Sequence, residues 1–348
     1  MIKTAIIGAS GYTGFELMKL LLAHPEADLL AVTSRQYKGQ AVADIFPSLT
    51  GITDLVFSDT DDLASSGTNE AELVFTALPH GTSQAVVAKC VTGGQKVIDL
   101  SADFRLKEAD AYKTWYGADH QAPALLKTAV YGLPELHRDD IRGATLVANP
   151  GCYPTCAILG LAPLLKAGLI KGESVIIDAK SGVSGAGRGL NLATSYVEVN
   201  EGFKAYNVGV HRHTPEIEQE LALCAAGATT VTFTPRLLPL NRGMVATIYA
   251  TLTGEYATES LLAAFSDFYR DEPFVRVMDA DTYPNLNQVR NSNYCDIGCK
   301  ADSRTGRVVV VSALDNLIKG ASGQAVQNMN LIYDLPETTG LTRSPDPI

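Results

Sequence analysis

Short apolar runs alternate with segments in which apolar residues recur every three or four positions over the first 150 residues. Short runs bounded by glycine or polar residues predict buried strands, and the wider spacing predicts amphipathic helices. The predicted strands are 3–7, 29–33, 73–78, 96–100 and 145–148. Helices are predicted at 15–23 and 84–90, and residues 130–135 read as a turn-rich connector. Strands that alternate with helices indicate a parallel sheet and the α/β class.

The pattern changes after residue 150. Alternating apolar and polar positions at 229–233 and 244–252 predict strands exposed on one face, as in a largely antiparallel sheet. Further strands are predicted at 174–178 and 307–313, helices at 157–167, 261–269 and 321–331, and an irregular tail at 336–348. We therefore expect a Rossmann-type domain followed by an α+β domain with a mostly antiparallel sheet.

Composition narrows the class of protein. The chain has 348 residues, long enough for two cores, with 46% hydrophobic and 19% charged residues. It lacks a run of about 18 apolar residues and a signal-peptide pattern, so no membrane span is expected. A formal charge of −10 argues against a nucleic-acid partner. Six scattered cysteines do not form a disulfide framework, which favours a reducing, cytoplasmic setting.

A glycine-rich turn follows the first strand. Gly8, Gly11 and Gly14 are spaced G-x2-G-x2-G between a strand and a helix, a variant of the dinucleotide fingerprint. In such a turn the backbone approaches the pyrophosphate, which binds at the helix N-terminus. An ordinary βα turn is the alternative. The expected cofactor-binding residues are Gly8, Ser10, Gly11, Tyr12, Thr13 and Gly14.

The end of the second predicted strand indicates which dinucleotide binds. NAD-preferring folds usually carry an acidic residue here, bonded to the ribose 2′-hydroxyl. This chain has Ser34 and Arg35 instead, with Lys38 nearby. A hydroxyl and a guanidinium suit a 2′-phosphate, so we expect NADP(H), although Arg35 could also be an ordinary surface residue.

Cys152 is the expected nucleophile. It follows an Asn-Pro-Gly turn, and Pro154 suits the first turn of a helix. At a helix N-terminus the partial positive charge favours the thiolate, which could form a covalent acyl intermediate. A small buried cysteine is the alternative for an isolated residue of this type.

Two histidines form the other chemically dense segment. His211 and His213 are two residues apart, so both point to one side of an extended segment, and Pro215 starts a helix that carries Glu216. We expect His211 to be the acid/base group, with His213 and Glu216 binding or orienting the substrate. Zinc held by His211, His213, Glu216 and Cys152 is one alternative, and a purely structural role is another.

Two loops follow strands at the edge of the sheet where ligands bind in parallel α/β folds. They contain His80 and Arg105, the further substrate-binding predictions. Arg105 is the expected phosphate ligand, because a guanidinium pairs with phosphate oxygens. A structural ion pair with Asp103 is the alternative.

Nine motifs together resemble those of the N-acetyl-gamma-glutamyl-phosphate reductases of arginine biosynthesis, relatives of aspartate-semialdehyde dehydrogenase. The resemblance runs from Ile6 to about Gly323. Its motifs are residues 8–14, 33–35, 78–81, 99–105, 131–135, 149–155, 181–188, 211–216 and 315–316.

The resemblance implies a domain arrangement and a reaction. Residues 1–150 and about 314–348 would form the NADP-binding domain, and 151–313 the catalytic and oligomerisation domain of a homodimer or homotetramer. Ser181, Gly182 and Asn316 would also contact the cofactor. NADPH would reduce N-acetyl-gamma-glutamyl phosphate through a Cys152 thioester, releasing inorganic phosphate and N-acetylglutamate 5-semialdehyde.

Other functions stay open at this stage. A sister reductase could act on an aminoadipyl phosphate, because one methylene is worth only about 1–3 kcal/mol in a pocket. A non-catalytic NADPH-binding regulator and a zinc hydrolase are the remaining alternatives.

Overall fold

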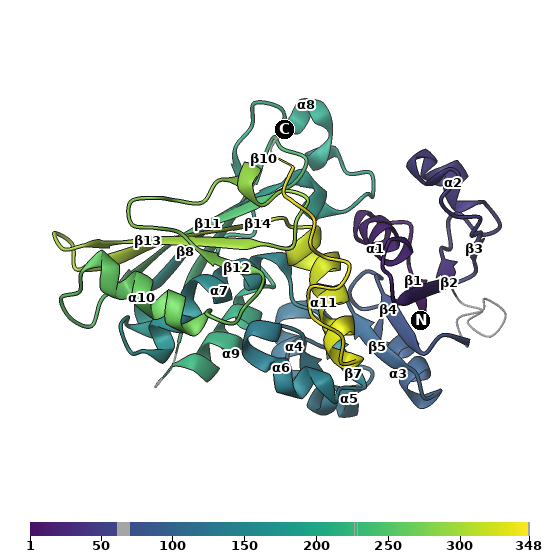
Figure 1. Ribbon diagram of the computed structural model, residues 1–348, viewed down its shortest axis with the longest axis horizontal. Coiled ribbons are helices and arrows are strands. Elements are labelled where there is room, and N and C mark those ends of the chain that lie inside the picture. Colours follow the sequence, from purple (N-terminus) through teal and green to yellow (C-terminus); the bar gives the residue numbers. More distant parts are fainter. Residues whose placement is uncertain (61–69, 226, 228, 347–348) are drawn as a thin grey trace. The chain divides into compact units, whose positions relative to one another are not determined.

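The computed structural model describes residues 1–60, 70–225, 227 and 229–346, which form two compact units (Figure 1). Unit 1 comprises residues 1–150 and 321–342, and unit 2 comprises 151–320 and 343–348. The sequence placed the return to the first unit near residue 314. Strand β14 (Arg307–Leu314) pairs along its whole length with β11 (Met244–Thr251) and β13 (Cys295–Asp302), so the chain stays in unit 2 up to Gly320.

Unit 1 is built on a parallel sheet with strand order β3-β2-β1-β4-β5-β7-β6. The strands are β1 (Ile2–Ile7), β2 (Ala27–Thr33), β3 (Phe57–Ser58), β4 (Leu73–Thr76), β5 (Lys96–Asp99), β6 (Val130–Tyr131) and β7 (Leu146–Ala148). Its central strands are apolar and wholly buried, as expected for a parallel sheet covered on both faces. All their carboxyl ends therefore lie at one edge.

Helices cover this sheet on both faces, as Figure 1 shows for α1 and α11 on one side and α3 and α5 on the other. The helices of unit 1 are α1 (Tyr12–Leu22), α2 (Val42–Ile45), α3 (Gln84–Thr92), α4 (Ala109–Tyr116), α5 (Pro123–Thr128), α6 (Pro134–Arg142) and α11 (Gly323–Ile332). Ala5 and Ile7 of β1 pack with Val87 of α3 and Leu126 of α5 in one buried cluster. The connector expected at 130–135 is in fact a short strand followed by the start of α6.

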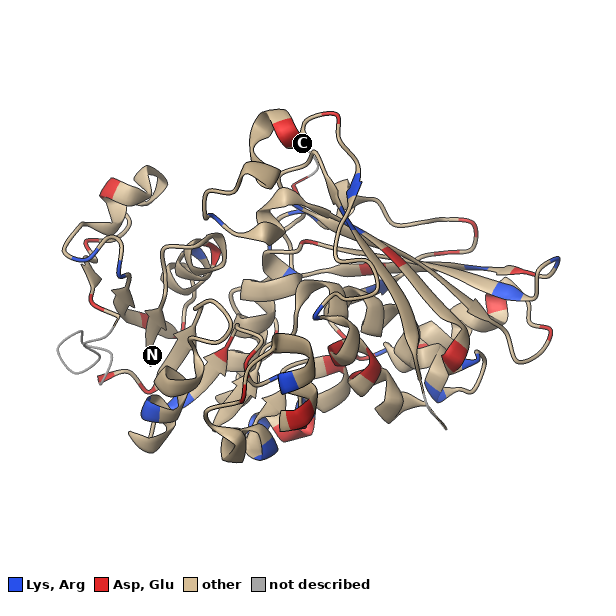
Figure 2. Ribbon diagram, turned by 180° about the vertical axis from the view of Figure 1, so that it is seen from behind, with Lys and Arg blue, Asp and Glu red and all other residues tan. Residues whose placement is uncertain are grey.

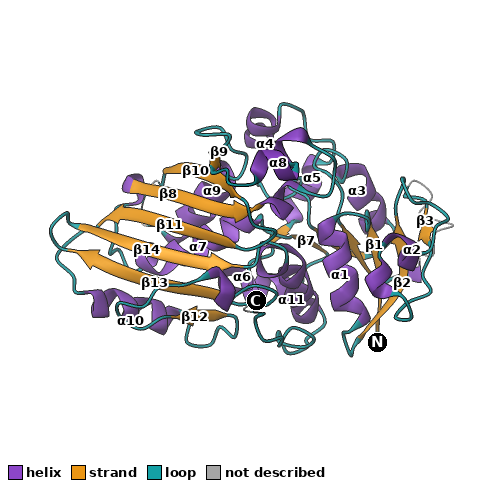
Figure 3. Ribbon diagram, turned by 90° about the horizontal axis from the view of Figure 1, so that it is seen from above, coloured by secondary structure: helices purple, strands orange, loops and turns teal. Residues whose placement is uncertain are grey.

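Unit 2 is built on a mixed sheet with strand order β12-β13-β14-β11-β8-β10-β9, seen face-on in Figure 3. Its other strands are β8 (Val175–Gly182), β9 (Lys204–Ala205), β10 (Val231–Leu238) and β12 (Val275–Val277). The central pairs β8–β11, β11–β14 and β13–β14 are antiparallel, as the alternating pattern predicted. Pairs β8–β10 and β12–β13 are parallel.

One face of this sheet carries helices α7 (Cys152–Lys166), α9 (Thr214–Cys224) and α10 (Thr258–Phe268), and α8 (Tyr196–Val199) lies in the long segment between β8 and β9 (Figure 1). Residues 153–165 of α7 are all buried, which explains why this helix is apolar on every side. Gly160 lets it approach the sheet, because a Cβ there would lie 3.1 Å from Ile248 Cδ1.

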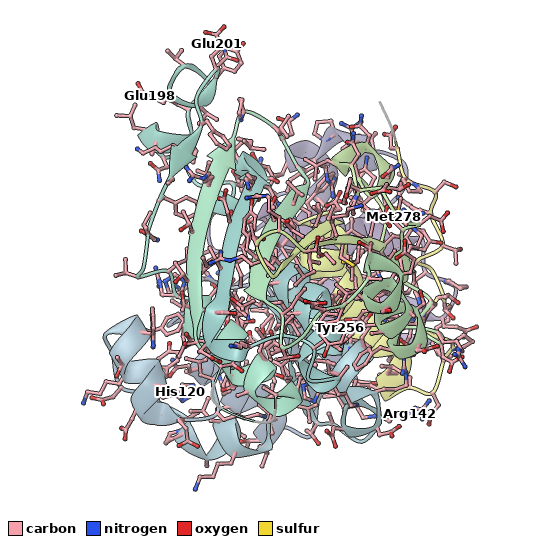
Figure 4. The ribbon with its side chains drawn as sticks, turned by 90° about the vertical axis from the view of Figure 1, so that its left-hand side faces the viewer. His120, Arg142, Glu198, Glu201, Tyr256 and Met278 are labelled. Atoms are coloured by element: carbon pink, nitrogen blue, oxygen red, sulfur yellow. The ribbon has the colours of Figure 1, made fainter. Side chains whose placement is uncertain are left out.

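Three further observations complete the description. None of the helices among the described residues combines the length and the apolar composition needed to cross a membrane. Lys and Arg positions are interspersed with Asp and Glu positions in each unit (Figure 2). The labelled Glu198 and Glu201 lie at the outer tip of the α8 segment of unit 2 (Figure 4).

Candidate active site

The glycine-rich turn of unit 1 is bonded directly to the end of β2. The N–H of Gly8 donates to Thr33 Oγ1 at 3.2 Å, and the N–H of Ala9 donates to the Thr33 carbonyl at 2.9 Å. The hydroxyl of Ser34 donates to that of Ser10 at 3.0 Å. The structure thus brings together the two segments predicted to bind the dinucleotide.

The three glycines of this turn differ in their surroundings, and so in the reason why each position has no side chain. Gly14 packs on the Ala9 backbone, because a Cβ there would lie 2.5 Å from the Ala9 carbonyl oxygen. Gly8 has φ of +88°, and a Cβ there would lie 2.8 Å from the Ala77 oxygen. At Gly11, the residue before α1, a Cβ would meet nothing within 4 Å. The space beside Gly11, at a helix N-terminus, fits a pyrophosphate.

The two predicted cofactor residues that follow Gly11 begin α1. Tyr12 is 38% exposed, and the Thr13 carbonyl accepts the Ser322 hydroxyl at 2.8 Å. The cationic side chains after β2, Arg35 and Lys38, are both exposed, and Lys38 pairs with Asp59 at 2.7 Å.

Two buried carboxylates hold the loops at the carboxyl ends of β4 and β5. Asp99 accepts the hydroxyls of Thr76, Ser83 and Ser101 at 2.5–2.6 Å, and burial raises its pKa. Asp103 accepts the N–H groups of Gly81 and Ser83 and the hydroxyl of Tyr112. The two N–H bonds to Asp103 fix the backbone immediately after His80.

The predicted substrate residues of unit 1 have different surroundings. His80 is exposed and packs edge-on against Tyr116, with ring centroids 5.9 Å apart. Arg105 is buried, and its Nε and Nη2 donate to the carbonyls of Asn149 at 2.8 Å and Leu100 at 3.0 Å. Arg105 therefore ties the end of β5 to the segment after β7 that leads to Cys152.

Cys152 is the first residue of α7, in unit 2, and its side chain is partly exposed. This confirms the prediction that Cys152 lies at a helix N-terminus, although the apolar spacing alone had placed the helix at 157–167. The N–H of Gly151, the residue before α7, donates to Glu216 Oε1 at 2.8 Å. Glu216 is 1% exposed, so this carboxylate anchors the turn that presents Cys152.

His211 and His213 lie together, with ring centroids 4.7 Å apart. The segment is a turn before α9, however, and not the extended segment that the sequence predicted. The His211 ring packs against Tyr153, Tyr206 and Phe233 at 5.2–5.7 Å. Burial and the neighbouring Arg212 charge lower the pKa of His211 to about 4, so the ring is neutral at pH 7.

Cys152 belongs to the same neighbourhood. It interacts electrostatically with the hydroxyls of both Tyr153 and Tyr206, and burial raises the pKa of each phenol, that of Tyr206 to about 12. Tyr206 donates to Tyr153 at 3.2 Å, and Tyr153 donates to the Arg236 carbonyl at 3.3 Å. The two tyrosines therefore link the predicted nucleophile to the predicted acid/base group.

The remaining predicted cofactor residues form one cluster at the end of β8. Asn316 Oδ1 accepts the N–H of Gly243 at 2.7 Å, and its Nδ2 donates to Ser184 Oγ at 3.0 Å. Ser181 is buried, and a Cβ on Gly182 would lie 2.7 Å from the Arg242 nitrogen. The side chain of Asn316 thus joins the loops that follow β8 and precede β11.

The zinc alternative has no support in the geometry. Among residues 1–60, 70–225, 227 and 229–346, no group of three or more His, Cys, Asp or Glu side chains could hold a metal ion.

Burial raises the pKa of the Cys156 and Cys299 thiols to about 12, which makes them poor nucleophiles.

Two family models cover most of the chain. Residues 3–144 match the model described as "Semialdehyde dehydrogenase, NAD binding domain", and residues 152–316 match "Semialdehyde dehydrogenase, dimerisation domain". The chain belongs to the semialdehyde dehydrogenase family. Its α/β fold, with a Rossmann-type domain and a second domain on a mixed sheet, is that of the family.

Within this family, similar relatives carry one name. The N-acetyl-gamma-glutamyl-phosphate reductase of Symbiobacterium thermophilum is 54% identical, over 98% of this chain and 97% of the relative. That of Citrifermentans bemidjiense is 54% identical over 99% of both chains. Aspartate semialdehyde dehydrogenase II from Vibrio cholerae, solved in complex with ASA, has the same fold, with a TM-score of 0.74, 15% identity and coverage of 96% of this chain and 98% of that one. Aspartate semialdehyde dehydrogenase from Candida albicans, solved with NADP, has a TM-score of 0.72 and 17% identity, with coverage of 96% of this chain and 98% of that one.

Sequence reasoning on this semialdehyde dehydrogenase chain missed several residues of the site. Tyr153 lies within the motif of residues 149–155 but has no separate sequence signal, and Tyr206 has none because it is a single tyrosine in a loop. Gly320 lies against the nucleophile, since a Cβ there would be 2.8 Å from Cys152 Cβ. The buried Asp315, paired with Arg242 at 2.8 Å, also binds backbone N–H groups of the turn before Gly320.

Proposed function

We propose that the chain catalyses the NADPH-dependent reduction of N-acetyl-gamma-glutamyl phosphate to N-acetylglutamate 5-semialdehyde and inorganic phosphate, a step of arginine biosynthesis. The observation that carries this proposal is the position of Cys152, partly exposed at the first residue of α7. A thiolate is favoured at a helix N-terminus, and a thiolate can displace phosphate from an acyl phosphate. The names of relatives that are 54% identical over nearly the whole chain give the substrate.

The dinucleotide is proposed to bind at the turn of residues 8–14, with Ser34 and Arg35 at the 2′-phosphate. The open space beside Gly11 and the exposed Arg35 support this assignment. NADPH supplies the hydride when bound. Ser181, Gly182 and Asn316 of unit 2 are also proposed to contact the cofactor, since their cluster is part of the same unit as Cys152.

The proposed roles of the substrate residues follow from the charge of each side chain and from the groups to which it is hydrogen-bonded. Arg105 is proposed to provide positive charge for the phosphate group, with its guanidinium held in place by the carbonyls of Asn149 and Leu100. His80 and His213 are proposed to contact the substrate. Glu216 is assigned a positioning role, because its carboxylate binds the N–H of Gly151, next to Cys152. A Cys152 thioester is the proposed intermediate.

Two or four copies of the chain are proposed to assemble through unit 2. The sheet face opposite α7, α9 and α10 exposes Ile176 at 37% and Tyr249 at 36%, and the α8 segment exposes Leu190, Tyr196 and Val197 more fully. Apolar side chains on this scale favour contact with another protein surface. We place the reaction in the cytoplasm, because six scattered cysteines are not the pattern of a disulfide framework.

The reaction is best assayed in reverse, because acyl phosphates hydrolyse readily. NADPH formation is followed with N-acetylglutamate 5-semialdehyde, phosphate and NADP⁺, for the wild type, Cys152→Ser and Cys224→Ser. Cys224 is the matched control, since it is also partly exposed but lies at the end of α9. Phosphate-dependent activity that only Cys152→Ser abolishes supports the proposal.

Three other results would change the assignment. Activity that needs no phosphate indicates an ordinary aldehyde dehydrogenase. Activity only with the semialdehyde one methylene longer indicates the aminoadipyl sister reductase. No activity on either, with tight NADPH binding, indicates a regulator.

A further inference from the structure

The His211 ring accepts a hydrogen bond from the backbone two residues further along the chain. The N–H of His213 donates to Nδ1 of His211 at 3.1 Å. A ring nitrogen that accepts a hydrogen bond carries no proton, so the proton of the neutral imidazole must be on Nε2. The turn before α9 therefore selects one tautomer of His211.

Two other histidines in the chain make the same turn and provide an internal check. In His24 and His120, Nδ1 also accepts the N–H of the second residue along, at 3.1 and 3.0 Å. Nε2 of His120 lies 2.8 Å from the backbone carbonyl of Asp103, and Nε2 of His24 lies 3.0 Å from Asn330 Oδ1. A carbonyl oxygen can only accept, so Nε2 is the protonated nitrogen in this turn.

The surroundings of His211 keep the ring neutral. The ring packs against Tyr153 from α7, Tyr206 from the loop after β9, and His213 from its own segment, and the charge of Arg212 acts on it. Neither phenol is ionised near neutral pH, because burial raises the pKa of both. The Arg212 charge and burial both disfavour a second proton on the imidazole.

We propose that His211 acts through Nε2–H as a hydrogen-bond donor to the oxygen of the reacting carbonyl, and does not accept the thiol proton of Cys152. This inference rests on the proposed function and refines it. A base must have an available lone pair where the proton arrives. In this tautomer Nε2 carries a hydrogen and has no lone pair to accept a proton, and the lone pair of Nδ1 accepts the N–H of His213.

The reaction balances without proton transfer to His211. The Cys152 thiol loses its proton to water at the N-terminus of α7. The thiolate forms the C–S bond, the C–O bond to phosphate breaks, and the leaving phosphate takes one proton from water. After a hydride reaches the thioester carbon, the resulting oxyanion expels the Cys152 thiolate and becomes the aldehyde. The net reaction consumes one proton, which ends on phosphate, and His211 stabilises the oxyanion in both halves.

The first test measures the thiol alone and needs no substrate. Alkylation of Cys152 by iodoacetamide is followed by peptide mass from about pH 5 to about pH 10, in the full-length wild type, His211→Gln and His211→Phe. The proposal expects the same apparent pKa for Cys152 in all three proteins. A rise of about one unit or more in both variants would show that His211 had accepted the proton or paired with the thiolate, and would overturn the proposal.

The second test uses turnover in the reverse assay. Gln can place an amide N–H near the position of Nε2, but it cannot accept a proton, whereas Phe keeps the ring and has no donor. Loss of one oxyanion donor lowers kcat about 100- to 1000-fold, so we expect this loss in His211→Phe and at least about ten-fold more activity in His211→Gln. Equal loss in both variants would contradict the donor role.

A third measurement avoids variants that fold poorly. In wild-type protein labelled with ¹⁵N-histidine, the His211 signals should show Nε2 protonated and Nδ1 unprotonated at pH 7; the reverse tautomer would refute the inference. If the wild type has no reductase activity at all, the proposed function fails, while alkylation and the ¹⁵N spectrum still decide the protonation state.

Discussion

At the scale of single residues, three buried carboxylates fix the backbone of the loops that carry predicted site residues. Asp103, Glu216 and Asp315 each accept backbone N–H groups of a loop that carries predicted site residues, and each is at most 1% exposed. A buried carboxylate is stable only when its oxygens are hydrogen-bonded. Removing any of the three would therefore disturb a loop first, and the chemistry through it.

Arg35 sets the choice of cofactor in our assignment. We expect Arg35→Ala to raise the KM for NADPH about 10- to 100-fold, because a hydrogen bond to a charged group is worth about 1.5–3 kcal/mol. The KM for NADH should not change. Steady-state kinetics with both cofactors measures this, and Lys38→Ala is the matched control, since Lys38 is paired with Asp59. An equal effect on both cofactors would place Arg35 away from the 2′-phosphate.

His211 also makes stability depend on pH. Its folded-state pKa, about 4, is below the unfolded value of 6.5. The unfolded chain therefore takes up a proton first as the pH falls below 6.5, and the folded state loses stability until about pH 4. Between pH 7 and pH 5 this loss is about 2 kcal/mol. His211→Gln should lose that much less than the wild type in urea unfolding at the two pH values; parallel losses would contradict the lowered pKa.

At the scale of elements, periodicity located most long strands and helices but not their ends. The apolar spacing placed helix α7 at 157–167, whereas Pro154 indicated a start near Cys152, and the helix does begin at Cys152. Strand β13 was not predicted, since Gly298 and the buried Asp296 break its apolar run. Asp296 is accommodated by Arg276, which pairs with it at 2.7 Å. Tertiary partners of this kind cannot be read from a local pattern.

Helix α7 has a replaceable hydrogen bond near its middle. Pro163 has no N–H, so the Leu159 carbonyl lacks its usual partner within the helix. The Tyr269 hydroxyl donates to that carbonyl at 2.6 Å. We expect Tyr269→Phe to cost about 1–2 kcal/mol of unfolding free energy, since a buried acceptor is left unpaired.

The effect should shrink in a Pro163→Ala background, where residue 163 can donate instead. Chemical unfolding of the four proteins of this double-mutant cycle measures the coupling. Additive losses would show that Tyr269 stabilises unit 2 by packing alone.

At the scale of the whole molecule, the sequence indicated two domains but did not indicate that the last helix is completely buried. All ten residues of α11 are buried although several are amides. Gln324 and Asn328 donate to the Gly132 carbonyl, and Asn328 also donates to Asn149 Oδ1. Polar residues usually mark an exposed face, so the local pattern cannot show that this helix completes the core of unit 1. The motif residues of the site were predictable for the opposite reason, because their chemistry and spacing are local.

Unit 1 should fold from two distant pieces of chain. Asn149 Nδ2 lies 3.1 Å from the Ala321 carbonyl, so a short glycine-serine linker can replace residues 151–320. We expect residues 1–150 joined in this way to 321–342 to fold and bind NADPH, with lower affinity than the intact chain. Residues 1–150 alone should not fold, because without α11 the apolar surface that this helix covers and the Gly132 carbonyl would be exposed. Circular dichroism and NADPH fluorescence compare the two polypeptides, with Arg35→Ala in the linked one as the binding control. Folding and binding by residues 1–150 alone would show that α11 is not needed for the dinucleotide site.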